Sequence, residues 1–208
     1  MQNILLMRHG KVSAPPALYG VTDVEVVKNT NLDIVSALAA TQIDIQNIYS
    51  SPLKRCATLA QMVSQTMNID VAHVDELAEM NFGTFDGVPF DKMSKQDWLS
   101  VEPFWSDPVN HPLPQAESLS QFRARVLHGW HSLLALLSQP NKTTLVVAHG
   151  GVIRLILAEV LGLDWANPKL YSTLDIGNAS ITHLQFNSEF PAHVKVKTVG
   201  ASLHSFKL

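Results

Sequence analysis

The sequence predicts an α/β protein of three layers, α/β/α, in which helices cover both faces of a central, mostly parallel (mixed) sheet. Two observations support this prediction. Short apolar runs that stop abruptly at polar residues alternate with longer stretches in which apolar residues recur at helical spacing. The chain has 208 residues, 46% of them hydrophobic, which suits one domain over residues 1–208 better than two small ones.

The predicted strands begin with the apolar run at residues 4–7, which indicates a strand buried on both faces. Residues 144–148 repeat this pattern. Both runs end in a histidine followed by glycine, at His9 and His149. Further strands are predicted in the last part of the chain, at residues 170–174, 180–186 and 193–198.

Two helix starts can be recognised from capping residues. Ser51 and Pro52 predict a helix with Ser51 as N-cap and Pro52 as its first residue. Ser118 and Gln121 form a pattern like a capping box, and apolar residues follow at helical spacing. This second helix is expected to end at the Pro-Asn pair of residues 140–141, where the next strand begins.

Charge and cysteine content exclude several classes of protein. The 15 basic and 18 acidic residues give a formal charge of −3, which predicts no general attraction to nucleic acid or to an anionic membrane. A single cysteine cannot form an intrachain disulfide, and no secretory leader or membrane-spanning run is recognisable, so we expect a cytoplasmic protein. Whether it forms a homo-oligomer stays open.

Polar residues follow the ends of the predicted parallel strands, where ligands bind in open α/β sheets. Arg8 and His9 follow the first strand, Arg55 lies in the first turn of the helix after Ser51, and His149 ends the late strand. Gly150 then opens an apolar helix, whose free backbone N–H groups favour an anion. The sequence therefore predicts an anion site.

These residue types suit the hydrolysis of a phosphate monoester. A neutral imidazole, here His9, can attack phosphorus, while Arg8, Arg55 and a protonated His149 can hold the phosphoryl oxygens. A carboxylic acid of raised pKa can protonate the leaving oxygen, and Glu79 is the candidate. The histidines lack the paired spacing of a metal site and no nucleotide-binding glycine loop is present, so neither metal nor cofactor is expected.

Four motifs in order resemble the histidine phosphatase superfamily, also called phosphoglycerate mutase-like. They are Arg-His-Gly at residues 8–10, Ser-Ser-Pro-Leu-Lys-Arg-Cys at 50–56, and the segments at 77–87 and 148–154. The resemblance implies a phosphoglycerate mutase-like fold and an acid-type phosphatase that forms a phosphohistidine on a small-molecule phosphate monoester. It implies catalytic roles for His9, Glu79 and His149, and phosphate contacts by Arg8, Arg55, His149 and Gly150.

Within this superfamily, residues 18–24 resemble the alpha-ribazole-5'-phosphate phosphatase branch, which acts in cobalamin nucleotide-loop assembly. That resemblance makes Tyr19, Gly20 and Thr22 candidate substrate contacts. A broad-specificity sugar or organic phosphate phosphatase and a phosphoglycerate mutase are alternatives, although the insertion between Glu79 and His149 is short for a mutase. A catalytically inactive phospholigand-binding protein is the alternative from another class.

Several residues allow two interpretations. Glu76 and Asp86 compete with Glu79 as proton donor, and Arg154 is at least as well explained by a structural ion pair as by substrate contact. Cys56 is expected to be a buried structural thiol.

The Pro-rich residues 101–114 are expected to form a loop over the site or at its rim. Within it, Phe104 and Trp105 either line the leaving-group pocket, together with Tyr19, or anchor the loop on the core.

Overall fold

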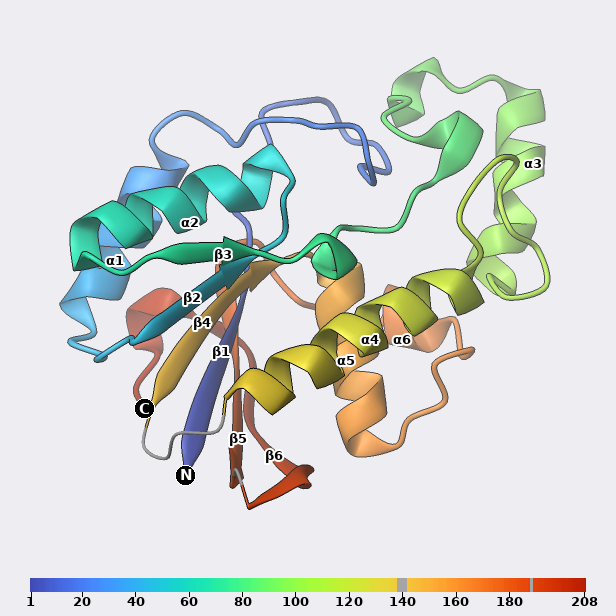
Figure 1. Ribbon diagram of the computed structural model, residues 1–208. Helices are drawn as coiled ribbons and strands as arrows, with labels where there is room; N and C mark the ends of the chain where they lie inside the picture. Colours follow the sequence, from blue (N-terminus) through green and yellow to red (C-terminus); the bar gives the residue numbers. More distant parts are fainter. Residues whose placement is uncertain (138–141, 188) are drawn as a thin grey trace.

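The computed structural model describes residues 1–137, 142–187 and 189–208, and these build a six-stranded sheet (Figure 1). In the spatial order β3-β2-β4-β1-β5-β6, the first four strands are parallel and the last two are antiparallel to their neighbours. This confirms the central, mostly parallel mixed sheet. The strands are β1 (Gln2–Arg8), β2 (Asn47–Ser50), β3 (Val71–His73), β4 (Thr143–Ala148), β5 (Ser180–Asn187) and β6 (Phe190–Ser202).

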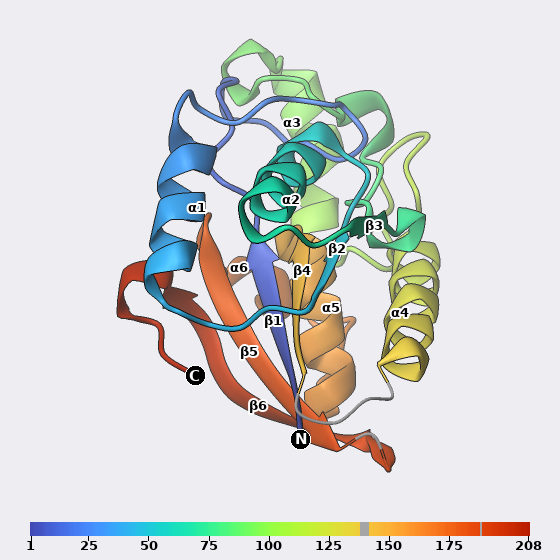
Figure 2. The same cartoon turned by 60° about the vertical axis from the view of Figure 1, so that its left-hand side comes forward.

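Helices cover both faces of the sheet, as the sequence predicts (Figures 1 and 2). The helices are α1 (Thr30–Ala40), α2 (Lys54–Met67), α3 (Lys95–Ser106), α4 (Leu119–Leu136), α5 (Gly150–Leu161) and α6 (Lys169–Ser172). One face carries α1 and α2, the other carries α4 and α5, and α3 lies beyond the carboxyl ends of the strands. Short 3-10 helices span Asp75–Leu77, Gly83–Phe85, Phe90–Lys92 and Leu203–Ser205.

The core has two layers because successive side chains of a strand point to opposite faces. Leu5 and Met7 of β1 pack with the apolar sides of α1 and α2. Ile4 and Leu6 belong to the cluster that α4 and α5 cover. These four side chains are completely buried, which explains why the run is apolar throughout instead of alternating with polar residues.

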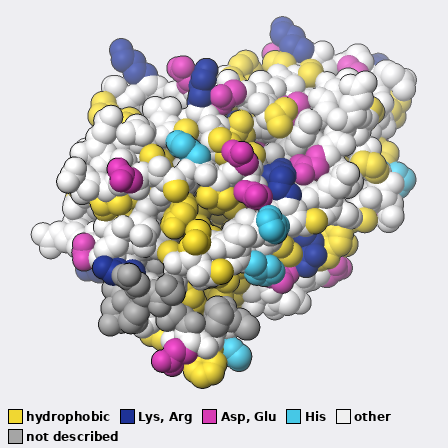
Figure 3. Space-filling view, viewed as in Figure 1, with side chains coloured by type: hydrophobic (Ala, Val, Ile, Leu, Met, Phe, Trp, Pro, Cys, Tyr) yellow, Lys and Arg dark blue, Asp and Glu magenta, His cyan; other side chains and the backbone are white. Residues whose placement is uncertain are grey.

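The surface carries charges of both signs. On the face drawn in Figure 3, acidic, basic and histidine side chains are intermixed, without a patch of one sign. Among the described residues, no helix has the length and hydrophobicity to cross a membrane.

One helix start is confirmed and the other lies further along than predicted. The Ser118 hydroxyl accepts a hydrogen bond from the backbone N–H of Gln121, and the Gln121 side chain accepts from that of Ser118, so α4 begins with a capping box. The end predicted at residues 140–141 lies outside the described residues. By contrast, α2 begins at Lys54 with Leu53 as N-cap, whereas the prediction placed Ser51 as N-cap and Pro52 in the first turn. Ser51 is buried and its hydroxyl contacts His149 instead.

Two further predictions were wrong in part. Residues 101–106 belong to α3, which begins upstream at a capping box of Ser94 and Asp97 and contains Pro103; only the remainder is a loop. At residues 169–172 the chain forms α6 instead of a strand, because Asn167 and Pro168 favour a helix start and accept hydrogen bonds from its first N–H groups. The other two predicted strands correspond to β5 and β6.

Candidate active site

The predicted site residues come together at the carboxyl ends of β1, β2 and β4. His9 directly follows β1 and His149 directly follows β4, and the backbone N–H of His9 donates to the carbonyl of Ala148 at 3.1 Å. The two imidazole rings lie edge to face, with centroids 5.2 Å apart. Arg55 reaches the same place from the first turn of α2.

His9 is held as a neutral ring, and its Nε2 has no hydrogen-bond partner in the described part of the chain. Its Nδ1 lies 2.7 Å from the carbonyl oxygen of Gly10, and since a carbonyl only accepts, Nδ1 carries the proton and Nε2 the lone pair. Burial lowers the pKa of His9 to about 3, and the positive charges of Arg55 and Arg8 act in the same direction. His9 therefore has the protonation state of a nucleophile.

His149 is also neutral, which differs from the protonated ring that the sequence analysis invoked. The Arg55 Nε–H donates to its Nδ1 at 3.2 Å, so the proton lies on Nε2, which faces the Ser51 hydroxyl at 2.7 Å. Burial, followed by the charge of Arg55, holds the pKa of His149 well below its ordinary value.

The guanidinium of Arg55 is 1% exposed and is oriented by the loop before α1. It donates to the backbone carbonyls of Tyr19 (3.0 Å), Gly20 (2.7 Å) and Thr22 (3.2 Å). Tyr19 also lines a pocket with His9 and Glu79, and the backbone carbonyls of all three candidate substrate contacts support Arg55. They fix the plane of the group that is predicted to hold phosphate.

Arg8 and Arg154 bring two more guanidinium groups to the start of α5. A Cβ added to Gly150 would lie 2.9 Å from Nη1 of Arg154 and 3.5 Å from Cζ of Arg8, so both side chains pass close to this glycine. Arg8 donates through Nη1 to the carbonyl of Ile176, while its buried Nε has no hydrogen-bond partner among the described residues. Burial lowers the pKa of both arginines.

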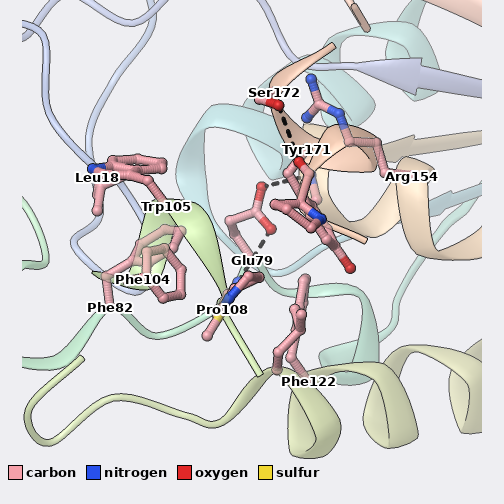
Figure 4. A pocket seen from close by; sticks show the side chains of 14 residues that line it. Leu18, Glu79, Phe82, Phe104, Trp105, Pro108, Phe122, Arg154, Tyr171 and Ser172 are labelled. Carbon is pink, nitrogen blue, oxygen red and sulfur yellow. Dashed lines mark hydrogen bonds between the residues drawn. The ribbon is translucent and has the colours of Figure 1, made fainter. Parts of the chain in front are cut away.

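Glu79 is the carboxylate with the strongest electrostatic effect on Arg8 and Arg154. Its two oxygens accept from the backbone N–H groups of Gly151 (3.1 Å) and Met80 (3.2 Å), as Figure 4 shows. A Cβ on Gly151 would lie 2.4 Å from a Glu79 oxygen, so the close approach needs glycine there. Glu79 competes with Glu76 and Asp86 as proton donor, and of these three it alone lines the apolar cavity that is described below. Asp86 accepts backbone hydrogen bonds elsewhere, and Glu76 packs on α4.

The family follows from comparison with known sequences. Residues 4–198 match the profile of the histidine phosphatase superfamily (branch 1). The chain belongs to the histidine phosphatase superfamily. Its members are phosphatases and mutases, and the residues that form the present site lie in the motifs that resemble this superfamily.

Two relatives are 30% and 32% identical to the chain over the parts that align. "Uncharacterized phosphatase PhoE" of Bacillus subtilis is 30% identical over 68% of the chain and 65% of its own length. "Putative phosphoserine phosphatase 2" of Hydrogenobacter thermophilus is 32% identical over 71% of the chain and 69% of its own length. The chain thus matches about two thirds of the length of these relatives.

Solved structures share the fold of the chain. YhfR of Bacillus stearothermophilus superposes with a TM-score of 0.84 at 19% identity, over 99% of the chain and 100% of its own. A structure from Escherichia coli, described as "a putative alpha-ribazole-5'-P phosphatase", superposes with a TM-score of 0.79 at 16% identity, over 96% of both chains. At these identities the likeness supports the phosphoglycerate mutase-like fold alone.

A mostly apolar cavity of about 220 Å³ opens beside Glu79. Figure 4 shows aromatic side chains on one side of Glu79 and Arg154 with Tyr171 on the other. This confirms that part of the Pro-rich stretch lies at the rim of the site. The apolar and aromatic lining includes Leu18, Phe82, Phe104, Trp105, Leu119 and Phe122.

Arg154 lines the cavity, whereas the sequence alone explains it at least as well by a structural ion pair. Its Nε donates to the carbonyl of Leu174 at 2.9 Å, and its side chain lines the cavity. Its position in the motif at residues 148–154 indicates that it lies near His149, but the sequence does not show which way its side chain points.

Two contacts of the histidines could not be recognised from the sequence. The Ser51 hydroxyl faces His149, and the Asn178 side chain donates to the carbonyl of His9 at 3.2 Å. The sequence pattern predicts that Ser51 is a helix cap, and Asn178 lies in a loop without a motif. Cys56 is fully buried beside His149, and burial raises the pKa of its thiol, in agreement with a structural role.

Proposed function

We propose that this chain is a metal-independent phosphomonoesterase that transfers the phosphoryl group of a small-molecule ester to His9 and then to water. The observation that carries this proposal is the neutral, buried His9, whose proton lies on Nδ1 and whose Nε2 is free, close to the positive charges of Arg8 and Arg55. Residues 1–208 would form one catalytic domain. A cytoplasmic location stays a prediction from the sequence.

In the first step, Nε2 of His9 attacks phosphorus as the bond from phosphorus to the ester oxygen breaks. Glu79 donates its proton to that oxygen, so the alcohol leaves neutral and Glu79 becomes a carboxylate. Arg8 and Arg55 stabilise the charge on the transferring oxygens, and the unpaired Nε–H of Arg8 gains an acceptor. A phosphate dianion near His149 would raise the pKa of that ring and favour its protonated form.

In the second step, water attacks the phosphohistidine and Glu79 takes the proton of the water. The bond between phosphorus and Nε2 breaks, the ring regains its lone pair, and inorganic phosphate leaves. Glu79 is again protonated, so the cycle closes without another reactant. The Gly151 N–H, which contacts Glu79 at 3.1 Å, keeps the carboxyl group aimed at the site in both steps.

We propose alpha-ribazole 5'-phosphate as the substrate. The segment at residues 18–24 resembles that branch of the superfamily, and a fold neighbour bears the corresponding name. The aromatic lining beside Glu79 also suits a leaving group with an aromatic ring, since such rings stack on Phe and Trp side chains. Phosphoserine is a second candidate, because the relative at 32% identity bears that name and Arg154 could pair with a carboxylate.

Two measurements test the proposal. The variant His9→Ala should lose turnover of p-nitrophenyl phosphate by more than about a thousandfold and form no acid-labile phosphoenzyme. Near-wild-type hydrolysis by this variant would reject the nucleophile. Separately, kcat/KM is compared for alpha-ribazole 5'-phosphate, phosphoserine, common sugar phosphates and 3-phosphoglycerate. A preference for any of the others over alpha-ribazole 5'-phosphate would reject the substrate proposal but not the mechanism.

A further inference from the structure

The segment that carries Glu79 lies directly against helix α4. A Cβ added to Gly129 of α4 would lie 2.6 Å from the Cβ of Glu76, so the two backbones approach as closely as only glycine allows. Residues 75–81 consist of a single turn of 3-10 helix and a loop, which is too short to hold its own shape. Their conformation must therefore be fixed from outside.

Arg125 of α4 supplies this fixation through its guanidinium group. Nη1 donates to the carbonyls of Glu76 and Ala78, both at 2.9 Å, and Nη2 approaches the carbonyl of Glu79 at 3.4 Å. Charged donors make stronger hydrogen bonds than neutral ones, and a planar guanidinium can bind several acceptors at once. One side chain thus spans the turn that ends at Glu79.

Glu117 orients Arg125 and also holds the far end of the same segment. Its two carboxylate oxygens accept from Nε (3.0 Å) and Nη2 (2.8 Å) of Arg125, and the pair is partly buried, with side chains 17% and 28% exposed. The backbone N–H of Glu117 donates to the carbonyl of Asn81 at 3.0 Å. The arrangement therefore contacts the segment on both sides of Glu79.

We infer that Arg125, oriented by Glu117, is a positioning residue that sets the place of the Glu79 carboxyl group for proton transfer. The Glu79 backbone is held by α4, while its carboxylate is held by the N–H of Gly151 at the start of α5. Arg125 is absent from the lining of the apolar cavity, and it lines a separate hollow together with Glu79, Asn81 and Glu117. This inference rests on the proposed function, since it presupposes that Glu79 donates the proton.

The test uses leaving groups that differ in their need for a proton. The full-length variants Arg125→Lys and Glu117→Gln are assayed for kcat/KM on β-glycerophosphate, whose alkoxide must be protonated, and on p-nitrophenyl phosphate, whose phenolate leaves readily. We expect both variants to lose about 10- to 100-fold on the first ester and less than about threefold on the second. The ratio of the two losses distinguishes loss of proton transfer from general damage to the fold.

A second comparison asks whether Arg125 acts through Glu79. Residues that act as a unit are not additive, so Glu79→Gln/Arg125→Lys should be no slower on β-glycerophosphate than Glu79→Gln alone. Additive losses, equal losses on both esters, or no loss in either Arg125→Lys or Glu117→Gln would overturn the inference. If Glu79→Gln itself shows no dependence on the leaving group while His9→Ala is inactive, the assignment of Glu79 fails and this inference with it.

Arg123 provides the matched control on the same helix. It pairs with Glu159 at 2.8 Å, with side chains about one third exposed, so the ion pair is similar but faces α5. Arg123→Ala should leave kcat/KM on both esters within about twofold of wild type. An equal leaving-group effect in Arg123→Ala would show that any arginine of α4 has this effect, which would also overturn the inference.

Discussion

His9 lies almost completely out of water beside two guanidinium groups, and both conditions disfavour a charged imidazole. The benefit for a nucleophile is that it stays unprotonated at any pH above its low pKa. The consequence for the fold is a dependence on pH, because the unfolded chain returns the same ring to water, where its pKa is ordinary.

The acid sensitivity of the fold should therefore depend on His9. Between the ordinary pKa of 6.5 and the folded pKa of about 3, the unfolded state binds a proton that the folded state does not, so stability falls as the pH falls below 6.5. From pH 7.5 to 5.5 this effect amounts to about 1 kcal/mol. We expect His9→Asn to lose about 1 kcal/mol less than wild type over that interval, as measured by urea unfolding at both pH values.

The control is His128→Asn, since this side chain of α4 is exposed to water in the folded chain. Between pH 7.5 and pH 5.5, this variant should lose as much free energy of unfolding as wild type. An equal loss of stability in His9→Asn and wild type would show that His9 is not kept neutral by the fold.

The loop before α1 is the element that orients Arg55, and Asp86 holds this loop. The Asp86 carboxylate accepts from the backbone N–H groups of Val21 (3.0 Å) and Thr22 (2.8 Å), and from that of Phe82 (3.0 Å). The carbonyls of the same loop accept from Arg55. Asp86 therefore connects the loop that orients Arg55, the proposed phosphate ligand, to the segment after Glu79, and its carboxylate contacts neither the Arg55 guanidinium nor the Glu79 carboxyl group.

Replacing this carboxylate by an amide should weaken phosphate binding. In Asp86→Asn one oxygen becomes an NH2 group, which cannot accept, so at least one loop N–H loses its partner at a cost of about 1–3 kcal/mol. We expect the inhibition constant of inorganic phosphate to rise about tenfold. The exposed Asp91→Asn serves as the control, and an unchanged inhibition constant in Asp86→Asn would contradict this role.

Elements with a strong local pattern were predictable, and those that depend on tertiary contacts were not. The fully apolar runs of β1 and β4 and the capping box of α4 are visible in the sequence because each is encoded within a few residues. The strand β3 has three residues and shows no periodicity. In α3, Pro103 suggested a loop, yet the capping box and the buried Val101 and Phe104 outweigh its effect on the helix.

The same distinction applies to the site. His9, Arg8, Arg55 and His149 lie at the ends of local motifs, so the rule for open α/β sheets was enough to bring them together. The groups that orient them come from distant positions: Ser51 faces a ring 98 residues away, and Arg125 reaches carbonyls 46 to 49 residues away. Such contacts follow from the fold and have no signature in the sequence.

At the scale of the whole molecule, the site is rich in positive charge although the net charge of the chain is negative. The chain carries a formal charge of −3, yet β1, α2 and α5 bring Arg8, Arg55 and Arg154 to one end of the sheet. These guanidinium groups are withdrawn from water. The charge of Arg55 lowers the pKa of Arg8, and the charge of Arg8 lowers that of Arg154. A bound oxyanion would offset this repulsion only in the folded state.

Inorganic phosphate should therefore stabilise the folded protein against heat. At a concentration one hundred times its dissociation constant, a ligand that binds only the folded state adds about 2.7 kcal/mol, which raises the Tm of a chain of about 200 residues by about 5–10 °C. The measurement is a thermal melt with phosphate against sodium chloride at equal ionic strength. Because phosphate also strengthens hydrophobic burial in general, Arg55→Met is melted in parallel and should keep less than half of the shift. Equal shifts in both proteins would mean that phosphate acts through the solvent and that Arg55 does not hold it.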